Sequence, residues 1–163
     1  VITRFLSGEI FIYEPIENLH QDQILKHSKI PAEISHQIFN QAQKNAKLIA
    51  DQLDYVGTMC VEYFIDQNDN LLVNEIAPRV HNSGHLTLNA FTISQFENHV
   101  RAVCDLKFEK SQKKSNAEMI NILGSEIEEY RSKTFQDGEF FVDYEKKSIK
   151  EKRKMGHLTV VKK

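Results

Sequence analysis

The sequence has no tryptophan, two cysteines, three prolines and six glycines among its 163 residues. Cys60 and Cys104 are too few and too far apart for a disulfide framework or a zinc site, so we expect reduced thiols. The glycines form no phosphate-binding loop of a familiar pattern. No apolar run reaches the roughly 18–20 residues that a membrane-spanning helix needs, so we expect no membrane partner.

The sequence also lacks an excess of positive or negative charge. Lys and Arg number 21 and Asp and Glu number 23, for a formal net charge of −2, so no global field favours nucleic acid or a membrane surface. With 40% hydrophobic and 27% charged residues, the composition is that of a globular protein. We see no export leader and therefore expect a cytoplasmic protein. The chain opens with "VITRFL", without an initiating Met, and we expect the C-terminal part of a longer enzyme.

The first part of the chain is predicted to contain a hairpin and a long helix. Residues 1–6 and 9–15 are rich in Ile, Val, Phe and Tyr and flank a short turn, which is typical of a β-hairpin. Residues 16–31 are polar and irregular. After them, apolar residues recur every three or four positions and predict one helix of about five turns. These residues are Ile34, Ile38, Ala42, Ala46, Ile49 and Leu53.

A second hairpin and a helical region follow. Residues 57–78 form two alternating runs around the turn-forming "QNDN". Residues 85–106 are predicted to be helical, and one face is expected to carry Ile93, Phe96, Val100 and Cys104.

The charged segment 107–117 is predicted to be a linker between two domains, 1–106 and 118–163. The second domain is small and β-rich, with three short strands and one helical piece.

The second hairpin carries a pair of glutamates. A turn of two or four residues sets Glu62 opposite Glu75, along with the pairs Phe64–Val73 and Asp66–Leu71. Two carboxylates opposite each other on one sheet face lie ~5 Å apart at Cβ and repel, unless a divalent cation such as Mg²⁺ binds between them. The alternative is that both strands lie at an edge and both glutamates point into water.

The segment "NEIAPRVHNSGH", residues 74–85, is unusually rich in polar chemistry. Arg79, His81, Asn82 and Ser83 offer donors suited to anionic oxygens, and Arg can bind them in a bidentate manner. Gly84 allows a close approach of the backbone. The segment is therefore predicted to receive an anionic reactive intermediate beside a metal-bound polyphosphate held by Glu62 and Glu75.

These residues carry a family resemblance. "YVGTMCVEYFID" and "LLVNEIAPRVHNSGHLTLNAFTISQFENHVRAV" resemble the C-terminal part of an ATP-grasp ligase, and are similar to the N5-carboxyaminoimidazole ribonucleotide synthetase family of purine biosynthesis. "RKMGH" near the end and "ENLHQDQIL" ahead of the long helix add to the match. The resemblance covers nearly the whole chain but only about the second half of such an enzyme.

The resemblance implies an α+β fold, the second half of an ATP-grasp domain with an antiparallel sheet and packed helices, followed by a small β-rich domain. It also implies a chemistry. ATP phosphorylates bicarbonate to carboxyphosphate, which carboxylates the exocyclic amine of aminoimidazole ribonucleotide, with Mg²⁺ or Mn²⁺ as the metal. Relatives are dimers, so a homodimer is expected.

Carried over to this chain, the resemblance assigns a role to eleven residues. Glu62 and Glu75 bind the metal; Asn74, Glu75 and His20 contact ATP. Arg79 and His81 lie at the carboxyphosphate and the amine, supported by Asn82 and Ser83. The phosphate of the ribonucleotide is bound by Lys146, Arg153 and Lys154.

Two departures and four alternatives accompany this interpretation. Many ATP-grasp enzymes have Asn two residues after the second metal Glu, where this chain has Ala77, and residues 146–154 are richer in Lys than expected. That basic run could instead be a solvated edge or a nucleic-acid patch, although it lacks interleaved aromatic residues. The chain could also belong to another ATP-grasp carboxylase or ligase, or be a non-catalytic fragment that dimerises or binds a partner.

Overall fold

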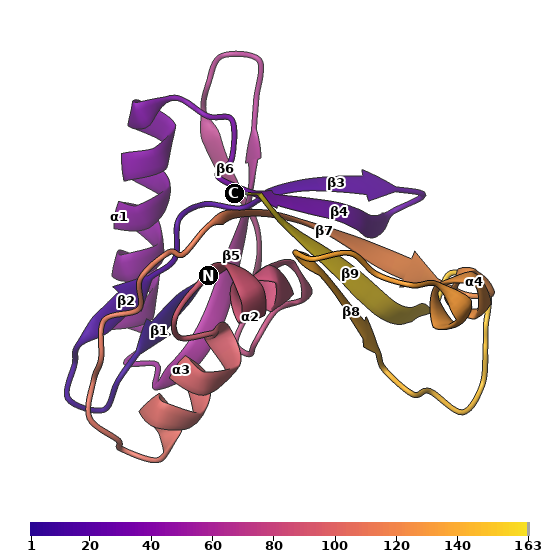
Figure 1. The fold of residues 1–163 in the computed structure, drawn as a ribbon. Coiled ribbons are helices and arrows are strands. Elements are labelled where there is room, and N and C mark those ends of the chain that lie inside the picture. The colour runs from indigo at the N-terminus through magenta and orange to yellow at the C-terminus, as the bar shows by residue number, and fades with distance from the viewer. Residues whose placement is uncertain (163) are drawn as a thin grey trace.

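The computed structural model describes residues 1–162 and contains two antiparallel sheets (Figure 1). The four-stranded sheet has the order β2-β1-β5-β6, and its strands are β1 (Ile2–Arg4), β2 (Ile10–Ile12), β5 (Gly57–Ile65) and β6 (Leu71–Ala77). The five-stranded sheet has the order β3-β4-β7-β9-β8. Its strands are β3 (Glu17–Gln21), β4 (Ile24–Ile30), β7 (Asn116–Leu123), β8 (Glu139–Asp143) and β9 (Lys154–Lys162).

The helices lie against these two sheets. Figure 1 shows α1 and α3 beside the four-stranded sheet, α4 beside the five-stranded sheet, and α2 between the two sheets. None of the helices described is long and apolar enough to cross a membrane. Their bounds are α1 (His36–Gln52), the 3₁₀ helix η1 (Asn82–Leu86), α2 (Thr87–Ala90), α3 (Gln95–Val103) and α4 (Glu126–Ser132).

The helix predicted after Pro31 is confirmed, because α1 places small residues against the sheet. The Ser35 side chain accepts a hydrogen bond from the backbone N–H of Ile38 and caps the helix. Ile38 and three alanines, Ala42, Ala46 and Ala50, form the buried stripe. Small side chains at these positions let the helix axis approach β1 and β5 closely. The prediction fails at both ends, since Ile34 precedes the helix and Leu53 is 58% exposed.

Residues 16–31 contain regular structure, contrary to the prediction. They form the hairpin β3–β4, whose two turn residues, Asp22 and Gln23, both have positive φ (50° and 65°). This is the conformation of a type I′ turn, which usually has Asn or Gly at these positions. The turn residues therefore gave no clear hairpin signal, and β3 is polar because most of it faces solvent.

The predicted apolar face of the second helical region is also wrong. Val100 is 54% exposed, whereas Gln95 and Asn98 on α3 are completely buried. Helix α3 thus turns a polar face towards the protein interior, and this is possible because its buried amides are hydrogen-bonded. The hairpins at 1–15 and 57–78 and the three C-terminal strands are confirmed.

The predicted register of the β5–β6 hairpin is confirmed at the two glutamates. Glu62 pairs with Glu75, as predicted. The predicted pairs nearer the tip are wrong, because the register there is shifted by one residue. The observed pairs are Tyr63 with Val73, Phe64 with Leu72 and Ile65 with Leu71.

Two irregularities of this hairpin, a three-residue turn and a β-bulge, shift the register in opposite directions. The turn has three residues, between Asp66 and Asn70, and Asp69 has φ 58°, as in three-residue turns that end in a left-handed residue. Compared with the predicted turn of two or four residues, a three-residue turn shifts the register by one residue. A β-bulge then leaves Asn74 without a pairing partner and shifts it back before Glu75.

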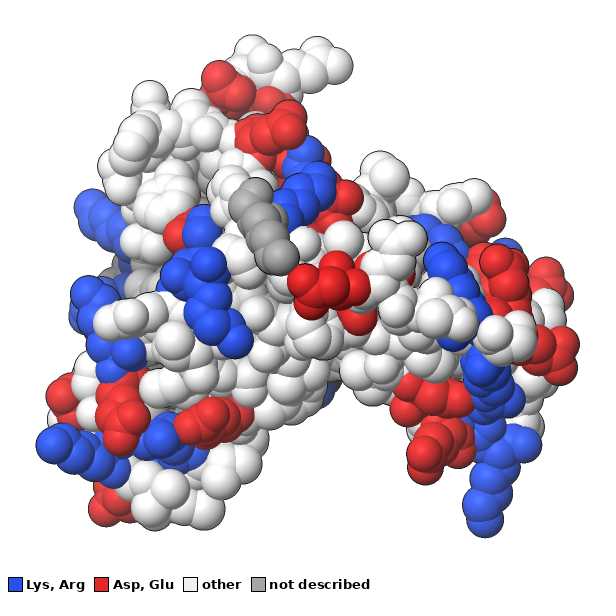
Figure 2. All heavy atoms as spheres, in the orientation of Figure 1, with Lys and Arg blue, Asp and Glu red and all other residues white. Residues whose placement is uncertain are grey.

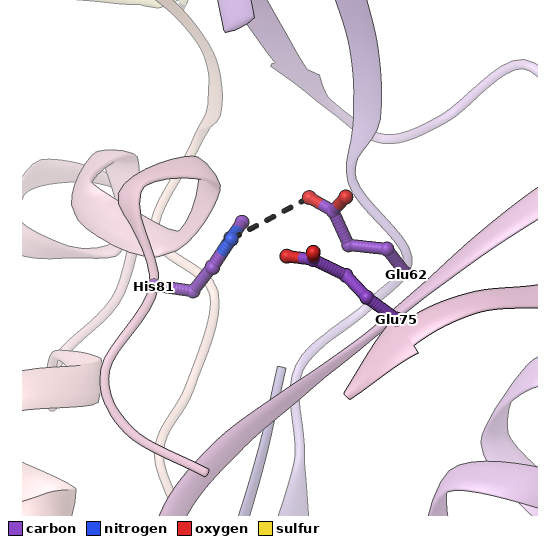
Figure 3. Close-up of side chains that lie close together, drawn as sticks. All are labelled: Glu62, Glu75 and His81. Atoms are coloured by element: carbon purple, nitrogen blue, oxygen red, sulfur yellow. Dashed lines mark ion pairs between the residues drawn. The ribbon is translucent and has the colours of Figure 1, made fainter. Parts of the chain in front are cut away.

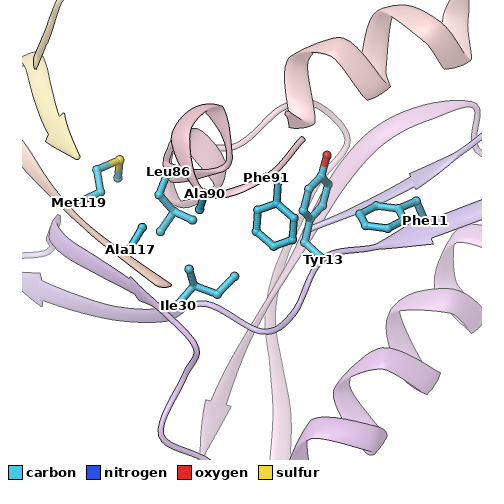
Figure 4. Packing of buried hydrophobic residues seen from close by; sticks show 8 residues of the cluster. All are labelled: Phe11, Tyr13, Ile30, Leu86, Ala90, Phe91, Ala117 and Met119. Atoms are coloured by element: carbon cyan, nitrogen blue, oxygen red, sulfur yellow. The ribbon is translucent and has the colours of Figure 1, made fainter. Parts of the chain in front are cut away.

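An apolar cluster joins the two sheets (Figure 4). It combines side chains from both sheets with η1, α2 and the residue that follows α2. Leu86 and Ala90 are completely buried in it. The segment that follows β6 is therefore held between the two halves of the molecule. The cluster contains Phe11, Tyr13, Ile30, Leu86, Ala90, Phe91, Ala117 and Met119.

The predicted linker is packed against the rest of the chain. Thr92 and Gln112 exchange two hydrogen bonds, and the buried Ser111 hydroxyl donates to the carbonyl of Ile93 at 2.8 Å. The five-stranded sheet combines β3 and β4 with strands that follow the linker. The division of the chain at residues 107–117 stays a prediction.

Candidate active site

Eight of the eleven predicted site residues line one cavity of about 1120 Å³. The cavity lies against the β5–β6 hairpin, helix α1 and the β3–β4 hairpin, and one part of its wall is apolar. The eight residues are His20, Glu62, Asn74, Glu75, Arg79, His81, Ser83 and Lys154. Asn82, Lys146 and Arg153 do not line it.

Two carboxylates and an imidazole converge on one point of this cavity (Figure 3). The ligand atoms of Glu62, Glu75 and His81 all lie within 4.8 Å of one another. The Nε2 atom of His81 is 3.5 Å from a carboxylate oxygen of Glu62, and both side chains are largely buried. Asn74, displaced by the bulge, approaches the other Glu62 oxygen to 3.5 Å.

The surroundings of His81 determine its charge and its tautomer. Burial lowers the pKa of His81 to about 4, and the nearby cations Arg79 and Lys154 lower it as well, so the imidazole is neutral at pH 7. Its Nδ1 atom accepts a hydrogen bond from the backbone N–H of Ser83. An accepting Nδ1 leaves the proton on Nε2, which faces Glu62.

The donor set fits a divalent cation. Carboxylate oxygens are the ligands that Mg²⁺ and Mn²⁺ prefer, and Glu62 and Glu75 supply them from opposite strands. His81 can join them through Nε2 only in the tautomer whose proton is on Nδ1, which would then donate a hydrogen bond to the Ser83 hydroxyl at 2.8 Å. Glu62 and Glu75 are therefore the residues that would hold the cation, which neutralises phosphate charge when bound.

Asn82 joins η1 to the five-stranded sheet. Its amide exchanges two hydrogen bonds with the amide of Asn121, at 2.6 and 3.0 Å, and Asn121 also donates to the carbonyl of Leu25. Asn121 is completely buried on β7. The pair fixes the start of η1 relative to the five-stranded sheet. Asn121 was missed from the sequence, since an isolated Asn in an apolar strand gives no functional signal.

The three predicted phosphate-binding residues lie along the start of β9 and the loop before it. Lys154 is partly buried beside the cavity, and burial lowers the pKa of its ammonium group. Lys146 donates to the carbonyl of Lys154 and lies 5.2 Å from the ring centre of Tyr144. Arg153 donates to the carbonyl and the hydroxyl of Ser148. Basic side chains gather over the β8–β9 loop at the lower right of Figure 2.

A cluster of aromatic and histidine rings lies beside these residues and was missed from the sequence. The ring of His85 is 5.4 Å from that of His157 and 5.0 Å from that of Phe96, and the hydroxyl of Tyr144 is 2.9 Å from Nδ1 of His157. Burial lowers the pKa values of His85 and His157 to about 4 and raises that of Tyr144 to about 12. All three groups are therefore neutral at pH 7.

Comparison with known families identifies two matching regions. Residues 1–96 match the model of the ATP-grasp domain, and residues 117–163 match that of the phosphoribosylaminoimidazole carboxylase C-terminal domain.

Individual relatives agree with these matches. The N5-carboxyaminoimidazole ribonucleotide synthases of Bacillus subtilis and Brucella melitensis are each 40% identical over 99% of this chain. A solved N5-carboxyaminoimidazole ribonucleotide synthetase with ADP is 38% identical, with a TM-score of 0.93 over 99% of the chain. The synthase of Aspergillus clavatus, solved with ADP and 5-aminoimidazole ribonucleotide, is 31% identical with a TM-score of 0.91. The chain spans 43–45% of the length of these four proteins.

The buried histidines predict a dependence of stability on pH. His157 is 1% exposed and has a pKa of about 4, against about 6.5 in the unfolded chain. Between these values the unfolded state binds a proton that the folded state does not, so the free energy of unfolding falls as the pH drops from 6.5 to 4. The contribution of His157 is on the order of 3 kcal/mol, since one pKa unit corresponds to about 1.4 kcal/mol.

Urea denaturation of His157→Gln across this pH range measures the effect. We expect a shallower decline of stability with acid than in the unsubstituted protein. His36→Gln, which changes an exposed histidine, is the control and should keep the original slope. Equal slopes for all three proteins would show that His157 is protonated equally in both states.

Proposed function

We propose a function from one premise: the chain belongs to the ATP-grasp family. It forms the C-terminal part of a ligase that carboxylates 5-aminoimidazole ribonucleotide with ATP and bicarbonate, giving N5-carboxyaminoimidazole ribonucleotide in purine biosynthesis. Bicarbonate oxygen bonds to the γ-phosphorus and ADP leaves. The carboxyl carbon of the resulting carboxyphosphate then bonds to the exocyclic amine nitrogen, while phosphate leaves and the amine loses a proton.

One observation carries this proposal. The carboxylates of Glu62 and Glu75 and the donors of the following segment, Arg79 and His81, share one cavity with an apolar wall. A metal-bound polyphosphate needs the first pair, a purine-like ring suits the apolar wall, and a carboxyphosphate needs cationic and neutral donors beside them. The names of the similar proteins agree with this assignment.

In this proposal Asn74 and His20 contact the nucleotide from the same cavity as the two glutamates. Arg79 is exposed and has a guanidinium group that can bind an anionic oxygen pair. His81 is neutral, and in the tautomer whose proton is on Nδ1 and donated to the Ser83 hydroxyl, its Nε2 can accept the proton that the amine loses. The resulting imidazolium faces the carboxylate of Glu62. Ser83 supports His81, and Asn82 holds the segment to the neighbouring sheet.

The phosphate of the ribonucleotide is assigned to the basic residues at the start of β9. Lys154 lines the cavity, and Lys146 and Arg153 flank it on the preceding loop. The rings of His85, Tyr144 and His157 lie close together and give this region neutral, flat surfaces beside cationic groups. Such a combination suits an imidazole ring attached to a phosphorylated sugar.

The metal assignment predicts the effect of removing one carboxylate charge. In the intact enzyme, Glu75→Gln keeps the side-chain shape but weakens the divalent-cation site, so turnover should fall by about two orders of magnitude or more. Mn²⁺ titration followed by electron paramagnetic resonance should show weaker binding in the presence of ATP. Glu62→Gln should behave similarly.

The double variant provides the internal control for this prediction. Because the two carboxylates act on one cation, the double variant should be little worse than either single variant. Turnover near that of the unsubstituted enzyme at saturating Mg²⁺ would contradict the assignment of Glu62 and Glu75.

The phosphate assignment predicts a selective effect of Arg153. Arg153→Ala should raise the KM for aminoimidazole ribonucleotide about tenfold for each 1.4 kcal/mol lost, because a guanidinium–phosphate pair is bidentate. The KM values for ATP and bicarbonate should hardly change. Steady-state kinetics with each substrate varied in turn separates these effects.

Two exposed lysines on the same loop are matched controls. Lys150→Ala and Lys152→Ala remove a similar charge from side chains that face solvent, and should have little effect. If Arg153→Ala matches these two variants for all three substrates, the basic loop is a charged surface and the ribonucleotide is bound elsewhere.

We also propose that the intact enzyme is a homodimer in the cytoplasm. Helices α1 and α3 and the residue that ends α1 expose apolar side chains that a second subunit can cover, namely Leu48, Val100, Val103 and Leu53. Unpaired Cys60 and Cys104 suit a reducing compartment. Light scattering after size exclusion should give twice the mass of one chain, and cell fractionation should recover the protein with cytoplasmic markers. A monomer mass would contradict the dimer.

A further inference from the structure

Gln95 lies at the start of α3 and is completely buried, although no part of the proposed chemistry uses it. Its side-chain oxygen accepts a hydrogen bond from the backbone N–H of His81 at 3.0 Å. Its side-chain nitrogen donates to the backbone carbonyl of the same residue at 2.6 Å. One amide thus binds both backbone groups of His81, as a neighbouring strand would.

These two bonds fix the orientation of the Gln95 amide. A backbone N–H can only donate and a backbone carbonyl can only accept, so the oxygen and the nitrogen of the amide cannot be exchanged. The second hydrogen of the nitrogen faces Nδ1 of His85 at 3.0 Å. An amide nitrogen is a donor only, so Nδ1 of His85 is an acceptor and the proton of this neutral imidazole is on Nε2.

Gln95 is itself held on several sides. Its backbone N–H donates to the Thr87 hydroxyl, which donates to the carbonyl of Gly84 at 2.6 Å. Its carbonyl accepts from the hydroxyl of Thr58, which is 2.7 Å from that of Thr3 on β1. A Cβ on Gly84 would lie 2.5 Å from the side-chain oxygen of Gln95, so only glycine leaves room for this amide.

We propose that Gln95 is a positioning residue that holds the backbone of His81 at the Glu62–Glu75 pair and keeps the proton of His85 on Nε2. The first part rests on the proposed function, because it concerns where His81 stands during turnover. The second part is a property of the folded protein alone. Gln95 acts through His81 and His85 and does not touch substrate.

The substitution Gln95→Glu tests both parts, since it replaces the donating nitrogen by an accepting oxygen of the same size. The proton of His85 should move from Nε2 to Nδ1, which ¹⁵N NMR of ring-labelled histidine detects. The carboxylate no longer donates to the carbonyl of His81. In the intact enzyme, kcat should therefore fall by about tenfold or more with little change in the KM for ATP, because the hairpin glutamates are unaffected.

Asn98→Asp is the matched control on the same helix. Asn98 is also completely buried, and its amide donates to the hydroxyl of Tyr13 at 2.8 Å, away from His81 and His85. The control should lower the melting temperature but leave the His85 tautomer and kcat unchanged. If Gln95→Glu does not fold, Gln95→Met, which keeps the volume and removes all side-chain hydrogen bonds, should show the same loss of kcat.

Three results would overturn the proposal. One is an unchanged His85 tautomer in Gln95→Glu, and another is a kcat equal to that of Asn98→Asp. The third is failure of both Gln95 variants to fold while Asn98→Asp folds, which would make Gln95 purely structural. Absence of carboxylation by the unsubstituted enzyme would defeat only the proposed function, because the tautomer is measured without turnover.

Discussion

The burial of the segment from His81 to Phe91 between the two sheets is the constraint on which the rest of the structure depends. Leu86, Thr87 and Ala90 are completely buried there, and Phe91 is 4% exposed. The apolar contacts of Leu86, Ala90 and Phe91 reach strands of both sheets (Figure 4), so this segment joins the two sheets. A segment that carries candidate site residues is therefore packed into the core, which suits a site that needs fixed geometry.

That constraint explains the many polar residues inside the protein. A segment without long regular structure has backbone groups that no ladder satisfies, and each would be costly if buried without a partner. Side-chain amides and hydroxyls supply the missing partners: Gln95 for the backbone of His81 and Thr87 for the carbonyl of Gly84. Buried polar side chains here replace secondary structure.

Burial and charge compete at the cavity. His81 lies close to the carboxylate of Glu62, which favours the imidazolium, yet burial and the cations Arg79 and Lys154 oppose it and lower the pKa of His81 to about 4. Burial is the largest effect. The same cavity is thus lined by a neutral imidazole, two carboxylates and two cations.

The sequence by itself determined the elements with strong local signals and the chemistry they carry. The apolar stripe of α1, the alternation of β5 and β6, and the dense polar segment after Glu75 are local patterns, and they led to the facing of Glu62 and Glu75 and to the family.

The tertiary structure alone decided what depends on distant partners. The hairpin β3–β4 lies at the edge of a sheet whose next strand, β7, follows about 90 residues later. The bulge at Asn74 corrects a turn whose length was misread, and Gln95 is buried because the backbone of His81, fourteen residues earlier, needs its amide. Hydrophobic periodicity cannot identify such a residue, because its burial is stabilised by specific hydrogen bonds rather than by apolar area.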